Sequence, residues 1–513
     1  MLTAVCTPVT FGNLSFFGAE VLSLEANLVS NYSVSVPTTY RFTQPAIEVV
    51  NAVFCNVTVT YTHPGQGDNV AVEAWLPPDG WNGRLQAVGG GGWVAGRSIF
   101  DIAMGGALGD GYAAISTDAG LRNAEDPSTW ALLSPGNVNL YNLQNLASVS
   151  LNDTAVIGKA LVKSYYGRGP DYTYWNGCSQ GGRQGLMLAQ RYPTAFDGIA
   201  AGAPAIYWTE IFPSMLWPQQ TMNMLGEYPY PCEIQAITAA AVSACDGLDG
   251  ITDGIISKTN DCLASFDPFD LVGQQINCTQ APTIGSAAAA VVNATWQGRH
   301  DAQGVQRWFG LNPGTDLSIG VAMTNCTGET CQGVPLSIAT EWISLFVARG
   351  GGINISNLSH IEFDSLAPQS RQWYNSVIDT DDADLSAFQN AGGKLITFHG
   401  LVDETIPSRS TSKYYNEVSA LIPSINDFYR HFEVPGMGHC AGRQSGEPTS
   451  LFDQLRAWVE NGTAPDHSSI KVTGLDGAEQ SRILCPYPQD VVFDQDCGAE
   501  GEARCWSCSE STP

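Results

Sequence analysis

The stretch YWNGCSQGGRQGL places Ser179 between Gly177 and Gly181 in the pattern G-x-S-x-G. This pattern is typical of a nucleophile elbow, in which a strand turns sharply into a helix and presents a serine hydroxyl above the sheet. The hydroxyl becomes an effective nucleophile when an imidazole takes its proton, and the imidazole in turn needs a carboxylate that fixes its tautomer. Because G-x-S-x-G alone is a weak signal, the chain must also supply a histidine and an acid.

The candidates for these two groups are Asp403 and His439. Asp403 follows the apolar stretch KLITFHG, and His439 lies in the stretch GMGHC after a late predicted strand. Both residues therefore follow strand ends, and the chain order of serine, acid and histidine is the one typical of α/β hydrolases. His399, inside the strand before the acid, is expected to pack beneath Asp403. Together these residues predict nucleophilic acyl transfer.

Each end of this candidate triad has a cysteine for a neighbour. Cys178 precedes the serine, and Cys440 follows the histidine. If Ser179 and His439 touch, the two cysteines are placed to form a disulfide that would hold both loops within hydrogen-bond reach. The alternative is that both cysteines are buried, reduced thiols that only pack well.

The tetrahedral intermediate of acyl transfer needs N–H donors for its oxyanion. One candidate is the backbone N–H of Gln180, the residue after the nucleophile, and a second is the N–H of Gly90 in the glycine run 89–92. The alternative for this glycine run is a flexible turn without a catalytic role.

A second motif, CDGLDGITDGIISKTNDC, crowds three carboxylates into eight residues. Carboxylates at this density repel one another unless a hard cation lies among them, which predicts a calcium site. Its ligands would be the three acids and two backbone carbonyls, from Asp246, Asp249, Asp253, Ile251 and Ile255. The spacing differs from an EF-hand, and the alternative is an exposed acidic turn. A disulfide between Cys245 and Cys262, which bracket the motif, would preorganise it.

Composition narrows the class of protein. The 513 residues carry 50 acids against 23 lysines and arginines, a formal charge of −27 that would repel a nucleic acid. Fourteen cysteines and ten N-x-S/T sequons point to an oxidising, glycosylating route and to N-glycans. The chain opens without a charged, apolar leader and contains no run of about 18 apolar residues. We therefore expect a mature, soluble, secreted protein without a membrane segment, whose Met1 replaces a removed signal peptide.

The order of predicted elements indicates an α/β fold. Antiparallel strands up to about residue 80 lead into strands that alternate with helices, a pattern that implies a largely parallel sheet. The alternation of strands and helices is not seen between residues 206 and 387, where six cysteines and many aromatic residues occur. We therefore expect an α/β-hydrolase domain built from residues 1–205 and 388–513. Residues 206–387 would form an inserted lid over the catalytic face, which lies at the carboxyl ends of the strands.

These motifs resemble the fungal tannase and feruloyl esterase family. The resemblance rests on NGCSQGGRQG, FHGLVD, GMGHC and CDGLDGITDGII, and extends through CNVTVTYTHPGQGDNV and YPYPCEIQAI from near residue 6 to beyond residue 485. It implies a triad of Ser179, Asp403 and His439, a bridge between Cys178 and Cys440, and a structural calcium in the lid. It also implies a substrate that is a small-molecule or oligosaccharide ester of a hydroxylated aromatic acid.

The resemblance leaves the acid itself open. The family divides between ferulate-type esters on plant cell-wall sugars, such as those of xylan, and galloyl esters of tannins. We expect a lid shorter than that of the large tannases that are processed within it, which favours a feruloyl esterase; tannase is the alternative. A third possibility is an inactive, calcium-stabilised binding protein. For the remaining cysteines, a bridge between Cys6 and Cys55 is plausible, and Cys505 and Cys508 predict a tail disulfide rather than a redox or zinc site.

Overall fold

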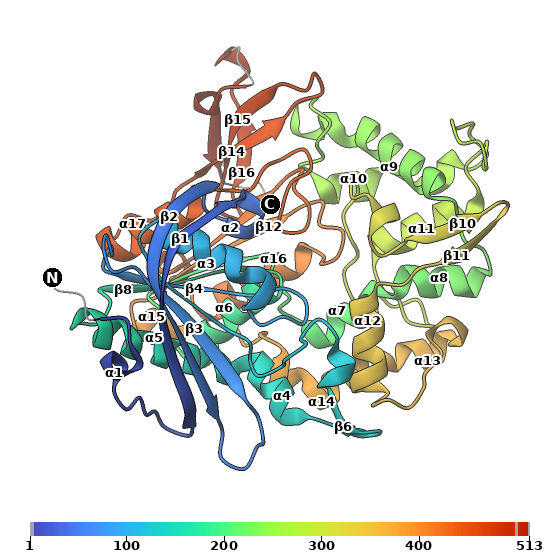
Figure 1. Ribbon diagram of the computed structural model, residues 1–513. Helices are drawn as coiled ribbons and strands as arrows, with labels where there is room; N and C mark the ends of the chain where they lie inside the picture. Colours follow the sequence, from blue (N-terminus) through green and yellow to red (C-terminus); the bar gives the residue numbers. More distant parts are fainter. Residues whose placement is uncertain (1–4, 498–500, 511–513) are drawn as a thin grey trace.

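The computed structural model describes residues 5–497 and 501–510. Its centre is a nine-stranded sheet in the order β1-β2-β3-β5-β4-β8-β9-β12-β13 (Figure 1). Along this order, neighbouring strands from β5 to β13 pair in parallel, whereas β1, β2 and β3 add an antiparallel edge. The predicted α/β-hydrolase fold is confirmed by this mixed sheet and by the structural relatives described below.

The antiparallel edge consists of long strands with alternating burial. β1 spans Glu20–Val36, β2 spans Ile47–Thr62 and β3 spans Val70–Leu76. In β2, Val57, Val59 and Tyr61 are buried, while the residues between them are partly exposed, so one face packs on the core. A disulfide joins Cys6, before β1, to Cys55 in β2.

The parallel strands are buried along nearly their whole length. They are β4 (Arg84–Val88), β5 (Ala113–Thr117), β8 (Tyr172–Cys178), β9 (Gly198–Gly202), β12 (Lys394–Gly400) and β13 (Tyr429–Val434). One face packs against α5 (Ser150–Tyr166), α6 (Gln180–Arg191) and α16 (Arg409–Leu421). The other face packs against α3 (Asp101–Gly109) and α17 (Leu451–Asn461). Helices on both faces explain why these strands read as continuous apolar runs.

The long segment between β9 and β12 lies partly to one side of the sheet. In Figure 1 its helices α8, α9 and α11 lie together to one side of the strands. It contains α7 (Trp208–Met215), α8 (Trp217–Leu225), α9 (Pro231–Cys245), α10 (Thr259–Ser265), α11 (Ser286–Gln297), α12 (Ser337–Glu341), α13 (His360–Asp364), α14 (Leu366–Ile378), α15 (Ser386–Asn390) and the hairpin of β10 (Thr324–Thr327) and β11 (Thr330–Gly333). Three disulfides brace it, namely Cys232–Cys278, Cys245–Cys262 and Cys326–Cys331. We refer to this segment as the lid, because residues 206–387 were predicted to form one; that role stays a prediction.

The C-terminal part adds two hairpins that the sequence did not reveal. β14 (Ser468–Thr473) pairs with β15 (Glu479–Leu484), and β16 (Asp490–Phe493) pairs with β17 (Trp506–Ser509). Cys505 and Cys508 do not pair with each other: Cys505 bonds to Cys497, and Cys508 bonds to Cys485. The tail is therefore braced at two points. Among the described residues, no helix has the length and apolar character needed to cross a membrane.

Candidate active site

Ser179 lies at the junction of β8 and α6 with φ near +61°, the sharp turn expected of a nucleophile elbow. Glycines make this turn possible. A side chain at Gly177 would meet the Gly181 carbonyl at 2.8 Å, and one at Gly181 would meet the Gly90 carbonyl at 2.9 Å. The Ser179 N–H donates to the Gly202 carbonyl at 2.9 Å, which ties the elbow to β9. The strained serine conformation is thus held by surrounding backbone.

Asp403 and His439 meet at the ends of β12 and β13. The His439 Nδ1 lies 2.7 Å from Asp403 Oδ2, within hydrogen-bond distance. The other carboxylate oxygen accepts the backbone N–H groups of Thr405 and Ile406, each at 2.8 Å. His399 Nε2 lies 3.1 Å from Asp403 Oδ2, so this histidine contacts the acid directly from within β12. Asp403 is therefore buried and fixed on several sides.

The protonation of this pair follows from burial and charge. Burial by itself raises the pKa of Asp403, but the neighbouring His439 and His399 outweigh it and hold that pKa well below its ordinary value. Burial by itself lowers the pKa of His439, but the charges of Asp403 and Glu404 outweigh it and raise that pKa above 6.5. A carboxylate that stays ionised beside a basic imidazole is the pairing that a general base requires.

A disulfide joins Cys178 to Cys440, with the two Cα atoms 5.9 Å apart and 262 residues between them along the chain. Cys178 is the last residue of β8, and Cys440 has φ near +65° in the loop after β13. The bond therefore links the residue before the serine to the residue after the histidine.

Ser179 and His439 line one cavity of about 180 Å³, together with Gln180 and Gly92. The remaining walls are mostly apolar and come mainly from the lid, where α7 and α12 face the serine. These lining residues are Ala205, Trp208, Ile211, Phe212, Met215, Ile338, Thr405 and Ile406. Trp208 is backed by an aromatic cluster, since its ring lies 5.5 Å from Trp93 and 6.1 Å from Trp342. The cavity is thus lined mostly by apolar side chains beside the serine and the histidine.

The structure gives Gly90 a different role from the oxyanion donor that the sequence predicted. Its N–H donates to Gln184 Oε1 at 3.1 Å, and its carbonyl accepts the Gly181 N–H at 3.0 Å. Both backbone groups are engaged in holding the elbow against the glycine run. Gly92, two residues later, lines the cavity instead. The candidate oxyanion donors are therefore the N–H groups of Gln180 and Gly92.

The acidic motif folds as a loop between α9 and α10, closed by the Cys245–Cys262 disulfide. Both carboxylate oxygens of Asp246 accept backbone N–H groups, from Asp253 at 3.0 Å and Gly254 at 2.9 Å. The aspartates thus organise the loop that carries them.

The other two aspartates accept the N–H groups two residues ahead. Asp249 accepts from Ile251 at 3.0 Å, and Asp253 accepts from Ile255 at 2.8 Å. Asp253 also forms a buried ion pair with Arg482 of β15.

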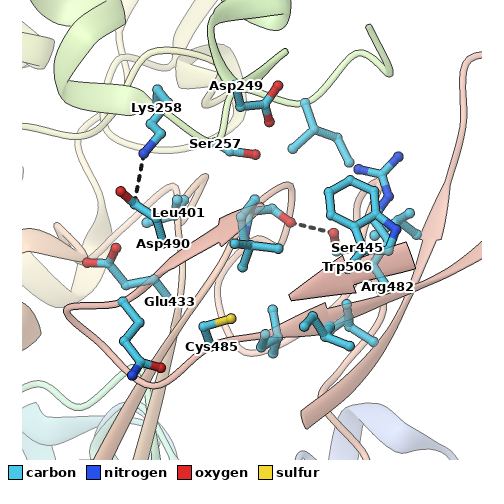
Figure 2. A pocket seen from close by; sticks show the side chains of 18 of the residues that line it. Asp249, Ser257, Lys258, Leu401, Glu433, Ser445, Arg482, Cys485, Asp490 and Trp506 are labelled. Atoms are coloured by element: carbon cyan, nitrogen blue, oxygen red, sulfur yellow. Dashed lines mark hydrogen bonds and ion pairs between the residues drawn. The ribbon is translucent and has the colours of Figure 1, made fainter. Parts of the chain in front are cut away.

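Carboxylate oxygens are ligands that a hard cation prefers, and Asp246 and Asp253 are both buried, with Arg482 paired to Asp253. Within residues 5–497 and 501–510, however, no three acidic, histidine or cysteine side chains converge as metal ligands do. Asp249 instead lines a separate cavity of about 100 Å³ between this loop and the C-terminal hairpins, where Lys258 pairs with Asp490 at 2.7 Å (Figure 2). Calcium in the loop therefore remains a proposal.

Comparison with known proteins agrees with this geometry. Residues 55–508 match the family model described as "Tannase and feruloyl esterase". The chain is 38% identical to a probable feruloyl esterase of Arthroderma benhamiae, covering 89% of this chain and 86% of the relative. It is 29% identical to a tannase of Aspergillus oryzae, and the match covers 86% of this chain and 83% of the relative.

A solved structure extends the likeness over nearly the whole chain. The tannin acyl hydrolase of Aspergillus niger superposes with a TM-score of 0.86 at 29% identity, covering 99% of this chain and 95% of the other. Feruloyl esterase B of Aspergillus oryzae has the same fold, with a TM-score of 0.78 at 24% identity and coverage of 97% and 98%. The chain therefore belongs to the tannase and feruloyl esterase family and is a carboxylic ester hydrolase.

Proposed function

We propose that this protein is a secreted serine esterase that releases ferulate-type hydroxycinnamic acids from esters on plant cell-wall polysaccharides, with Ser179, Asp403 and His439 as its triad. The observation that carries the proposal is the cavity that Ser179 and His439 share, because its other walls are aromatic and aliphatic. An aromatic acyl group can bury its ring there while its carbonyl carbon lies against the serine.

In the first half-reaction, His439 Nε2 accepts the proton of the Ser179 hydroxyl as Oγ attacks the ester carbonyl. The C=O electron pair moves onto oxygen, where the N–H groups of Gln180 and Gly92 stabilise the charge. Collapse of the intermediate breaks the bond to the alcohol oxygen, which takes the proton from His439. The products are the free alcohol and an acyl-Ser179 ester.

In the second half-reaction, water replaces the alcohol. His439 takes a proton from this water, the hydroxide oxygen attacks the acyl carbon, and the bond to Ser179 Oγ breaks. Oγ recovers the proton from His439, and the carboxylic acid leaves. Throughout, Asp403 holds the Nδ1–H of the ring, which fixes the tautomer that leaves Nε2 free to accept a proton.

The apolar walls also favour ferulate over gallate. A galloyl ring carries three hydroxyl groups, each of which needs a hydrogen-bond partner when buried. Among the residues that line this cavity, Thr405, Gln180 and Trp208 carry polar side-chain atoms, whereas Ile211, Phe212, Met215 and Ile338 offer no hydrogen-bonding N–H or O–H group. A feruloyl ring, with one methoxy and one hydroxyl group, loses less solvation at such walls.

Tannase remains the second candidate. The specific observation that favours it is the TM-score of 0.86 to a tannin acyl hydrolase. The 38% identity to a protein named probable feruloyl esterase, against 29% to one named tannase, supports the first candidate.

We expect kcat/KM for methyl ferulate to exceed that for methyl gallate by at least about tenfold, since each unpaired buried hydroxyl costs on the order of 1–3 kcal/mol. Initial rates of both esters, measured by chromatography of the released acids, give the ratio. A ratio at or below one would assign the protein to the galloyl ester hydrolases. Rates that are negligible for both esters, with a simple acetate ester still hydrolysed, would place the acyl group outside both classes.

Secretion and N-glycosylation are part of the same proposal. All seven disulfides, which use the fourteen cysteines, form within the described residues, and such bonds persist in oxidising compartments. Seven sequon asparagines are exposed, namely Asn13, Asn31, Asn277, Asn325, Asn354, Asn357 and Asn461, whereas Asn56, Asn152 and Asn293 are half-buried.

Calcium would act on stability rather than on chemistry. Since the acidic loop lies outside the cavity that contains Ser179, we expect a strong chelator to lower the melting temperature while kcat at low temperature changes little. Differential scanning calorimetry and esterase assays with and without chelator measure both. A matched variant, Asp249→Asn, should lower the melting temperature and make it insensitive to chelator. Loss of activity at an unchanged melting temperature would instead assign the ion a catalytic role.

A further inference from the structure

His439 is held by two consecutive carboxylates. Asp403 Oδ2 lies 2.7 Å from the ring Nδ1, and Glu404 Oε2 accepts the backbone N–H of the same histidine at 3.1 Å. The proposed mechanism uses the first contact and leaves the second without a function. Glu404 differs from Asp403 in that its side chain is 21% exposed, whereas the side chain of Asp403 is buried.

Several neighbours fix Glu404 in place. Arg443 Nη2 lies 3.2 Å from Glu404 Oε1, which ties the carboxylate to the far side of the histidine loop. A side chain at Gly438 would come within 3.0 Å of Glu404 Oε2, so this glycine lets the loop approach the carboxylate. From the lid, Gly320 packs against the Glu404 carbonyl, where a side chain would lie at 2.4 Å.

We infer that Glu404 is a positioning residue, which anchors the His439 backbone so that the imidazole stays between Asp403 and the serine. The inference rests on the proposed function, because it assigns His439 the role of general base. The loop after β13 departs from regular structure, since Cys440, Gly442 and Arg443 all have positive φ. The Cys178–Cys440 bond fixes one end of the loop, and Glu404 fixes the histidine itself.

Glu404 also affects the charge of the imidazole. Four groups with charge or titratable protons face His439: Asp403 and Glu404 after β12, His399 behind Asp403, and Arg443 on the histidine's own loop. The elbow and the lid face it with the hydroxyl of Ser179 and with apolar side chains. Burial lowers the pKa of His439, and the negative charges of Asp403 and then Glu404 raise it. His439 acts as a base only when its ring is neutral. The negative charge of Glu404 therefore moves the acid limb of the pH–rate profile to higher pH.

Three variants test this inference with 4-nitrophenyl acetate, whose hydrolysis does not depend on the natural acyl group. Glu404→Gln keeps an oxygen acceptor but loses the charge, so the acid limb of kcat/KM should move to lower pH, with a plateau close to that of wild type. Glu404→Ala loses the anchor too, and kcat per titrated serine should fall about tenfold with KM unchanged. Arg443→Gln removes a positive charge and should move the limb to higher pH.

Glu479→Gln is the matched control, because it makes the same change of charge on an exposed strand residue paired with Lys471. Its acid limb should coincide with that of wild type. A Glu404→Gln limb that also coincides with wild type, or full kcat per titrated serine in Glu404→Ala with only a lower melting temperature, would show that Glu404 is merely structural. Wild-type protein that hydrolyses neither the acetate nor methyl ferulate nor methyl gallate would overturn the proposed function instead, so the two failures are distinguishable.

Discussion

Replacing Ser179 by alanine is expected to lower kcat for ester hydrolysis by roughly 10⁴- to 10⁶-fold, because no other group can form the acyl intermediate. His439→Ala should cost about as much, since the hydroxyl then has no base. The double variant should be no worse than either single variant, because the two residues act as one unit. Asp403→Asn should retain a small activity, about 10³- to 10⁴-fold below wild type, because the imidazole can still partly orient.

The measurement is kcat and KM for methyl ferulate, with circular dichroism and melting temperature to show that each variant folds. Ser469→Ala is the matched control, since it makes the same chemical change at an exposed position of β14. Near-wild-type turnover in any of the three variants would remove that residue from the triad. Equal loss of folding in all three would leave the activity data without meaning for the assignment.

Much of this site could be predicted from the sequence because its chemistry is written in short motifs. The glycines around Ser179 predict a tight turn that bulky residues cannot make. Asp403 and His439 both follow apolar runs that end at the same edge of a parallel sheet. Chain order then gives their roles. The pairing of Cys178 with Cys440 follows from the same argument, because Ser179 and His439 line one cavity and their chain neighbours are therefore close.

Other features depend on side chains that reach across the fold, which local patterns do not reveal. The sequence places the glycine run 89–92 beside the elbow, as the structure does. It does not reveal that Gln184, buried on α6, accepts the Gly90 N–H, so it could not identify which glycine N–H is free to act as the oxyanion donor. Glu404 likewise looks like an ordinary loop acid until the histidine loop is seen to donate to it.

The C-terminal hairpins were missed for a different reason. Their strands are four to six residues long and pair with each other outside the main sheet, so they lack the long apolar runs by which the central strands were predicted. Cys505 and Cys508 are close in sequence and therefore suggested a bond with each other. In the structure Cys505 bonds to Cys497 and Cys508 bonds to Cys485.

Replacing Cys178 and Cys440 together by alanine is expected to lower kcat steeply although the serine, histidine and aspartate all remain. A histidine loop free to move by about 1 Å can cost on the order of 10²-fold in rate. Stability should fall as well, by roughly 2–4 kcal/mol, because the bond closes a loop of 262 residues. Each single variant should be no better than the double variant, since it leaves an unpaired thiol beside the site.

The matched control removes another disulfide, Cys326–Cys331, which joins adjacent strands of a lid hairpin only five residues apart in sequence. Its alanine double variant should keep kcat for methyl ferulate close to wild type, because the loop it closes is short and the hairpin lies outside the cavity lining. Peptide mapping without reduction checks the premise: a single linked peptide should carry both GCS and GHC. Recovery of Cys178 and Cys440 on separate, alkylatable peptides, or unchanged kcat in their double variant, would leave Glu404 and the packing of β12 and β13 to hold the histidine without the bond.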